Sequence, residues 1–212
     1  MFREAFEEVK RKIERYNEKR EIMIKKLRDV LRLSREAISK IHMGRRKEAE
    51  SLLLESKNII DEIHALAKEE PKLIFSGIFI DIAKEFVEAV LLLQIINRLA
   101  NKTDIPIPSS NNLGVPDEAW ILGLCEVTGE LKREILIALG KQDISLSYKL
   151  LNVIREIYDL VASLSFPGSI IPHLKAKIDY VRSILISSEE LIVRLKSERE
   201  ILRELKNLSE KK

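Results

Sequence analysis

The chain has 212 residues and a mass of 24.5 kDa, and its composition is 45% hydrophobic and 33% charged. With 7 glycines, 6 prolines and 5% aromatic residues, it lacks the turn residues of a β-sandwich or barrel, so the composition favours an all-α fold. The single cysteine, Cys125, excludes an intrachain disulfide and a multi-cysteine zinc site. The acidic opening segment and the absence of an apolar run of about 18 residues predict a cytoplasmic protein without a signal peptide or membrane span.

The basic residues gather near the N-terminus. The net charge is +3, but residues 1–50 alone contain 16 Lys and Arg against 10 Asp and Glu. Helical spacing places four of these cations on one stripe, and three more follow Gly44 directly: Lys25, Arg28, Arg32 and Arg35, then Arg45, Arg46 and Lys47. A basic stripe suits the phosphate backbone of a nucleic acid. A solvated helix face explains the same spacing, and both interpretations stay open from the charges alone.

Apolar residues recur at helical spacing through most of the chain and predict a bundle of about six to seven helices, several of them long. Gly44, Pro71, the proline-rich loop 102–117 and the turn 166–172 separate the expected helices. These helices span 2–42, 45–67, 73–99, 117–139, 145–164 and 172–206. Because no repeat or linker interrupts the pattern, we expect residues 1–212 to form a single helical domain.

Two helices carry carboxylates in unusual places. The third expected helix is apolar on nearly all sides in its C-terminal half, yet Asp81, Glu85 and Glu88 share one narrow arc of it. The fourth places Glu126 and Glu130 one turn apart. Burying such groups is costly unless cations compensate them. Carboxylate groups on two helices would suit Mg²⁺ or Mn²⁺, and an ion of this kind promotes phosphodiester hydrolysis.

The alternative is that both acidic groups are solvated faces, paired with Lys84, Lys132 and Arg133. Spacing alone favours this alternative. The sequence disfavours a ferritin-like di-iron site, because such a site uses two Glu-x-x-His pairs and the chain has none. The three histidines share no ligand spacing, and Cys125 lies among apolar neighbours, which is typical of core packing.

Two segments resemble a known family. The stretch AWILGLCEVTGELKREIL, residues 119–136, resembles the signature helix of the translin family, most closely in its translin-associated factor X (TRAX) branch. The stretch EFVEAVLLLQII, residues 85–96, is similar to the family's Glu-aromatic-Val-Glu-Ala-Val helix, and the order of long helices agrees over nearly the whole chain. Trp120 stands where the family has tyrosine, and Glu126 stands where the factor X branch has aspartate.

The resemblance implies an all-α translin-like fold and assembly into a hollow octamer, as in the eukaryotic component 3 promoter of RISC. It also implies Mg²⁺-dependent (or Mn²⁺-dependent) endoribonuclease activity. Carried over residue by residue, the catalytic and metal-binding carboxylates are Glu85, Glu88, Glu126 and Glu130. Because one chain holds the whole set, we expect a homo-octamer. RNA would bind to the basic residues of its interior, namely Arg28, Arg32, Arg35, Arg45, Arg46 and Lys47.

Two other functions remain open at this point. The chain would resemble translin itself if it bound RNA or single-stranded DNA without cutting it, with the four glutamates in structural roles. Alternatively, its apolar helix faces would serve only to assemble a helical scaffold. RNA affinity at moderate salt separates the scaffold from the other two, and metal-dependent cutting separates the nuclease from the binding protein.

Overall fold

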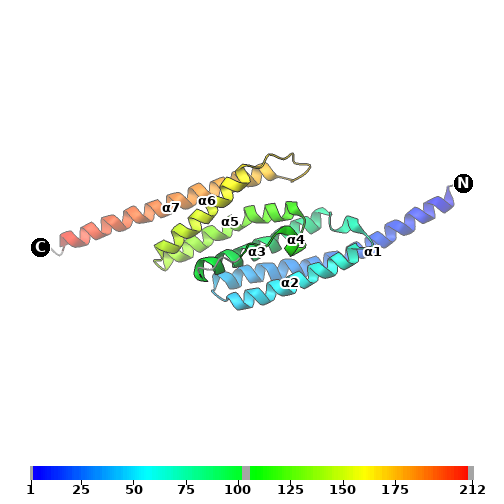
Figure 1. The fold of residues 1–212 in the computed structure, drawn as a ribbon, viewed down its shortest axis with the longest axis horizontal. Helices are drawn as coiled ribbons and strands as arrows, with labels where there is room; N and C mark the ends of the chain where they lie inside the picture. The colour runs from blue at the N-terminus through cyan, green and yellow to red at the C-terminus, as the bar shows by residue number, and fades with distance from the viewer. Residues whose placement is uncertain (1, 102–105, 210–212) are drawn as a thin grey trace. The chain divides into compact units, whose positions relative to one another are not determined.

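The computed structural model describes residues 2–101 and 106–209, and among these the side chains of all but 199–200 and 202–209. Seven α-helices and one 3₁₀ turn account for most of these residues, and no strand occurs among them, so the all-α prediction is confirmed (Figure 1). The elements are α1 (Arg3–His42), α2 (Arg46–Ala67), η1 (Pro71–Leu73), α3 (Gly77–Asn101), α4 (Ser110–Leu113), α5 (Asp117–Gly140), α6 (Ile144–Ala162) and α7 (Leu174–Ser209).

The chain divides into two compact units. Unit 1 spans Met1–Leu124 and unit 2 spans Cys125–Lys212, so the boundary falls within α5. The single domain expected from the sequence stays a prediction. None of the described helices combines the length and apolar composition that crossing a membrane requires.

Helix α1 forms because no glycine or proline interrupts residues 2–43. It ends where Gly44 adopts a left-handed conformation with φ of 76°. The Arg45 N–H then donates to the Lys40 carbonyl, and the Gly44 N–H donates to the Ile41 carbonyl, both at 2.8 Å. These two bonds form a Schellman cap, which satisfies carbonyls at the helix end and turns the chain into α2.

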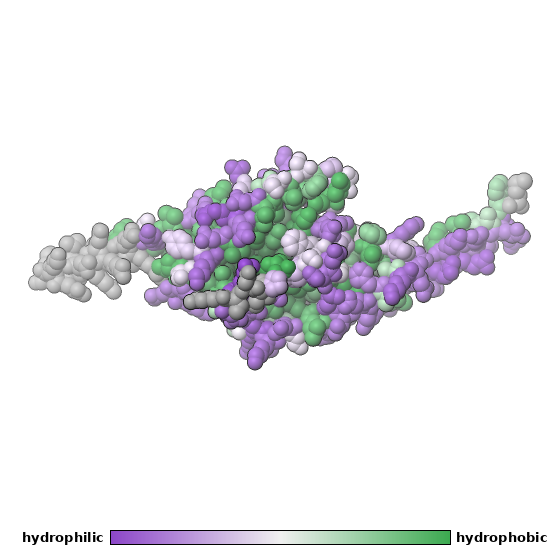
Figure 2. Space-filling view, in the orientation of Figure 1, coloured by the Kyte–Doolittle hydropathy of each residue, from purple (hydrophilic) through white to green (hydrophobic). Residues whose placement is uncertain are grey.

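In unit 1, α1 packs against α2 and α3, and α2 also contacts α3. The core between them includes fully buried side chains from all three helices, among them Met23, Leu27, Ile60, Phe79 and Phe86. Burying side chains of this size stabilises the unit by about 1.5–3 kcal/mol each. The first part of α1 lacks such cover. Its apolar residues Phe2, Phe6, Val9 and Ile13 are 53% to 79% exposed, and hydrophobic side chains lie between hydrophilic ones there (Figure 2).

The first half of α5 also belongs to unit 1 and approaches α3 closely. A Cβ atom added at Gly123 would lie 2.7 Å from the Val87 Cβ and 2.8 Å from the Lys84 carbonyl oxygen. Only glycine allows the two helix backbones to pack at this distance.

In unit 2, α6 packs against α7. Asp143 directly precedes α6 and caps it, because its carboxylate accepts a hydrogen bond of 2.9 Å from the Leu146 N–H. Buried apolar residues line these helices and the second half of α5, among them Leu131, Ile135, Leu150, Ile154 and Val181.

The structure differs from the predicted elements most clearly in three regions. Residues 71–73 form η1, so α3 begins at Gly77 and not at 73; the Ser76 hydroxyl donates to the Leu73 carbonyl at 2.6 Å. Within the predicted loop 102–117, Ser109 and Asn112 form a capping box that starts α4. Residues 102–105 of that loop lie outside the described part of the chain. Helix α7 begins at 174, two residues after Pro172, and runs to 209.

Candidate functional site

The first acidic pair lies on α3, where Glu85 and Glu88 are three residues, about one helical turn, apart. Both side chains are partly buried, and that of Glu85 is 26% exposed. The Nε of Arg35, on α1, donates to the Glu85 carboxylate at 3.3 Å. A cation from a neighbouring helix therefore already contacts this pair.

The second pair lies on α5, where Glu126 and Glu130 are four residues apart and 21% and 25% exposed at their side chains. The Lys177 ammonium donates to the Glu126 carboxylate at 2.5 Å. Arg133, one turn further along α5, lies 3.9 Å from the Glu130 carboxylate. Like the pair on α3, this pair has a cation from another helix beside one of its carboxylates.

Helix α7 contributes a second side chain at the same place. The hydroxyl of Tyr180 lies against the backbone of Gly129, in the space that a Cβ there would occupy. The Lys177 ammonium lies 5.6 Å from the centre of the Tyr180 ring, within the range of a cation–π interaction. The sequence analysis missed both residues. No local pattern marks them, because Lys177 reaches Glu126 across 51 positions of the chain.

Cys125 directly precedes Glu126 and is fully buried. Burial raises the pKa of the Cys125 thiol to about 12; the nearby charge of Glu126 adds to the rise, and Lys177 opposes it. The thiol is therefore protonated at neutral pH and unsuited to act as a nucleophile. This agrees with its predicted role in packing.

If the acidic groups were only solvated helix faces, they would pair with nearby surface cations, and some of these ion pairs are present. Lys84 lies 3.6 Å from the Asp81 carboxylate, which is largely exposed, and Arg133 is near Glu130, whereas Lys132 donates instead to the Ser187 hydroxyl at 2.7 Å. Within the described chain, no three His, Cys, Asp or Glu side chains are grouped as they would be around a metal ion. The two acidic pairs belong to different units, and the predicted four-carboxylate site stays a prediction.

Each pair by itself offers ligands of the right chemistry for Mg²⁺. This ion keeps several water molecules and binds proteins through one or two carboxylates. In each pair one carboxylate, that of Glu85 or that of Glu126, already contacts a cationic nitrogen of the protein. Two carboxylates about one turn apart match, in type and number, the protein ligands that Mg²⁺ takes.

The predicted basic stripe lies on the solvent side of α1. Lys25, Arg28, Arg32 and Arg35 are exposed, while the opposite face is buried at Leu27. Arg32 lies 3.7 Å from Asp29 and 3.9 Å from Glu36 on the same helix. Exposed ion pairs of this kind contribute at most about 1 kcal/mol, so they leave the stripe able to bind phosphate groups.

The second basic group follows the Schellman cap at the start of α2. Arg45 and Lys47 are exposed and Arg46 is half-buried. Arg45 lies 3.8 Å from Glu48. A hydrogen bond from Lys40 lowers the pKa of Glu48 below its ordinary value, and the charge of Arg45 lowers it further. These contacts link the end of α1, the helix that carries the basic stripe, to the start of α2.

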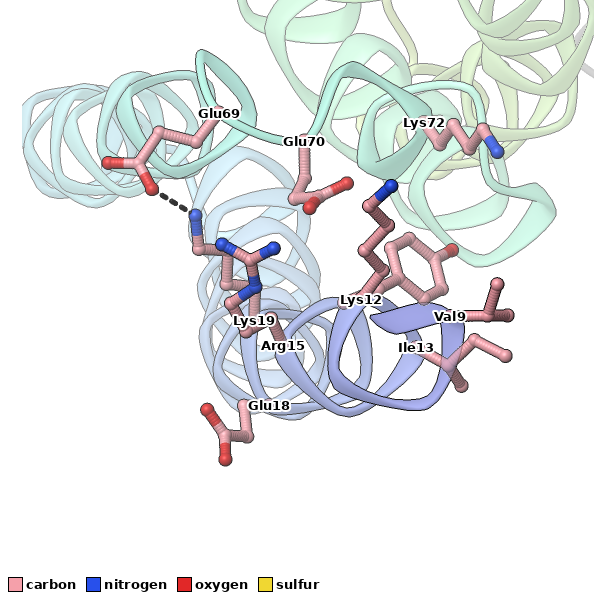
Figure 3. Close-up of a pocket in the computed structure, with 10 residues that line it drawn as sticks. Val9, Lys12, Ile13, Arg15, Glu18, Lys19, Glu69, Glu70 and Lys72 are labelled. Atoms are coloured by element: carbon pink, nitrogen blue, oxygen red, sulfur yellow. Dashed lines mark hydrogen bonds and ion pairs between the residues drawn. The ribbon is translucent and has the colours of Figure 1, made fainter. Parts of the chain in front are cut away.

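A groove of unit 1 lies elsewhere, between the exposed part of α1 and the segment that joins α2 to η1 (Figure 3). Lys19 forms an ion pair with Glu69 across it, and Lys12, Arg15 and Lys72 also line it. The groove contains none of the site residues predicted from the sequence.

Comparison with known proteins decides the family. The profile of the Translin family matches residues 18–196, which include both acidic pairs and the basic stripe. The chain belongs to the Translin family. The chain is also similar to an uncharacterised protein of Methanocaldococcus jannaschii, 30% identical over 168 residues, which are 78% of this chain and 71% of that protein.

Solved structures support the translin fold. The AfC3PO complex with duplex RNA has a TM-score of 0.80 and 26% identity, covering 92% of this chain and 98% of the other. A crystal structure of AfC3PO has a TM-score of 0.79, with the same identity and coverage. NeC3PO in its apo form, at 22% identity and a TM-score of 0.73, covers 89% of this chain and 95% of its own, and shows the shared fold alone.

Proposed function

We propose that this translin-family protein binds RNA and cuts it as a Mg²⁺-dependent endoribonuclease. The observation that carries the proposal is the pair of carboxylates, one turn apart and partly exposed, on each of the two helices that resemble the family's signature segments. The RNA part is supported by AfC3PO, a relative of the same fold whose structure is described in complex with duplex RNA.

The chain's residues have distinct parts in this proposal. The metal ligands are the carboxylates of the two pairs, Glu85 with Glu88 and Glu126 with Glu130. The exposed cations of α1 and of the following corner bind the RNA backbone. When bound, Mg²⁺ supplies the Lewis acidity that activates water and neutralises charge on the phosphate. Mn²⁺ has the same preference for oxygen ligands and would substitute for it.

Assembly is part of the proposal. We infer that the chain forms a homo-octamer, since a single chain carries all four carboxylates and its apolar residues on α1 are exposed in the subunit. RNA then binds to the interior surface of the assembly. Sedimentation velocity of the purified protein tests the octamer directly, and a stable monomer or dimer at micromolar concentration contradicts it.

The test of activity is incubation of an end-labelled RNA oligonucleotide with Mg²⁺, with Mn²⁺ or with EDTA. We expect wild-type protein to cut only with metal, and Glu130→Gln to bind RNA without cutting it. Glu118→Gln, a change of the same charge on the same helix, serves as the control and should cut normally. Full cutting by a folded Glu130→Gln variant would overturn the assignment of the site.

One observation favours a second function, RNA or single-stranded DNA binding without catalysis. Arg35 and Lys177 satisfy one carboxylate of each pair without any metal. In that case the four glutamates are structural, and the same assay shows RNA retained but uncut under every metal condition.

A further inference from the structure

The ion pair between Lys177 and Glu126 is more protected than those along the surface of α1. The nitrogen and oxygen lie 2.5 Å apart, and the two side chains are 26% and 21% exposed. By contrast, the side chains of Arg32 and Asp29 are each 59% exposed. Water and salt screen a partly buried pair less than an exposed one, so Lys177 holds Glu126 more strongly than a surface cation would.

Two contacts place the Lys177 ammonium against the acidic pair of α5. Lys177 lies in the first turn of α7, and Tyr180 follows one turn later, with its ring 5.6 Å from the ammonium. The Tyr180 hydroxyl fills the notch at Gly129, which lies between Glu126 and Glu130 in the sequence. The absence of a side chain at Gly129 therefore lets Tyr180 approach α5 and hold Lys177 beside Glu126.

An ammonium group and a divalent cation would both bind the carboxylate oxygen of Glu126. Lys177 donates hydrogen bonds to the carboxylate oxygen, and a hard metal ion would coordinate that oxygen. Two cations cannot share one partly buried carboxylate without strong mutual repulsion. A metal that binds Glu126 must therefore displace the Lys177 ammonium or tolerate it at a large loss of affinity.

We propose that Lys177 is a built-in competitor of the divalent cation for Glu126, and so sets the metal concentration at which the second acidic pair is occupied. The inference rests on the proposed metal site. It assigns a role to a residue of α7 that lies outside both segments carrying the family resemblance.

The test measures metal binding directly, with Mn²⁺ as the probe. Metal-stripped full-length protein is titrated with Mn²⁺, and free Mn²⁺ is followed by electron paramagnetic resonance. Removing the ammonium in Lys177→Met should tighten Mn²⁺ binding roughly tenfold, the effect of losing a charge-assisted hydrogen bond of about 1.5 kcal/mol. Lys177→Arg keeps the positive charge and should bind Mn²⁺ about as weakly as the wild type.

The matched control is Lys175→Met, which removes the same charge from an exposed position two residues earlier on α7. It should change the Mn²⁺ affinity by less than about twofold, because solvent screens an exposed charge. Lys177→Gln, which keeps a polar side chain, repeats the test should the methionine variant fail to fold, and circular dichroism checks each variant.

The outcomes separate this inference from the proposed function. If wild-type protein binds Mn²⁺ and cuts RNA while Lys177→Met and Lys177→Gln bind no tighter, the competitor role is overturned and the nuclease stands. Weaker Mn²⁺ binding by both variants also overturns it, because Lys177 would then position Glu126 for the metal. If no variant binds Mn²⁺ and none cuts RNA, both proposals fail.

Discussion

Gly123 on α5 lies directly against Val87 on α3, so that a Cβ added to the glycine would be 2.7 Å from the Val87 Cβ. The Lys84 carbonyl oxygen would be only 2.8 Å away on the same side. Val87 lies between Glu85 and Glu88, so this contact also fixes the backbone that carries the first acidic pair.

We expect Gly123→Ala to lower the free energy of unfolding by about 1–3 kcal/mol, because a backbone oxygen cannot move aside as a flexible side chain would. The cost exceeds the gain in helix propensity, about 1 kcal/mol. Urea denaturation measures the change. Gly140→Ala is the control, since nothing lies within 4 Å of a Cβ there. Equal stability of the two variants would contradict the close packing.

Gly129→Ala should also destabilise the protein, but here the obstacle is removable. The added methyl group would overlap the Tyr180 hydroxyl, whereas the ring carbon that bears it is 3.6 Å away. Tyr180→Phe should therefore recover part of the loss in the double variant, with a coupling energy of about 0.5–3 kcal/mol. A double-mutant cycle in urea measures this coupling, and additive effects of the two changes would contradict the contact.

Replacing Arg28 and Arg32 together by Gln should weaken RNA binding and reduce its dependence on salt. Each lost phosphate contact lowers the slope of log affinity against log salt by about 1. Fluorescence anisotropy at several salt concentrations measures this slope. The control is Lys141→Gln with Lys149→Gln, two exposed lysines of unit 2. An unchanged slope in the arginine variant would place RNA on another surface.

Cys125 should react slowly with thiol reagents in the folded protein at neutral pH, because it is buried and its pKa is raised to about 12. The unfolded thiol loses its proton near pH 9 while the folded one keeps it. The unfolding free energy therefore falls as the pH rises above about 9. The difference in this slope between wild type and Cys125→Ala, followed by urea denaturation, isolates the thiol from other groups. Identical slopes would contradict the raised pKa.

The sequence predicted the long helices well because local signals determine them. The uninterrupted run from 2 to 43 and the glycine after it define α1, and periodic apolar residues define α2, α3, α5 and α6. The sequence did not predict the shorter elements, α4 and η1. The Ser109–Asn112 capping box lies within a segment whose prolines indicated a loop. The turn η1 covers only the three residues that begin with Pro71, which the sequence marked simply as a break between helices.

The candidate site was predictable only on the helices that carry it. Glu85, Glu88, Glu126 and Glu130 stand out because charge interrupts an apolar face, and the family resemblance adds their roles. Lys177 and Tyr180 could not be found in this way. Their significance arises from tertiary contacts with Glu126 and Gly129, and an isolated Lys-x-x-Tyr on a polar helix has many equivalents.

Because tertiary contacts cover α1 unevenly, its local stability should change along its length. Residues near Met23 and Val30 are fully buried, whereas Phe2 and Phe6 are largely exposed and add little tertiary support to their turns. Helical turns without such support are marginal in water. In the isolated subunit, backbone amides of α1 should therefore exchange with deuterium fastest near the N-terminus and slowest where α2 and α3 cover the helix. Any partner that covers Phe2 and Phe6 would extend that protection along the helix, so amide exchange would locate the partner on the chain.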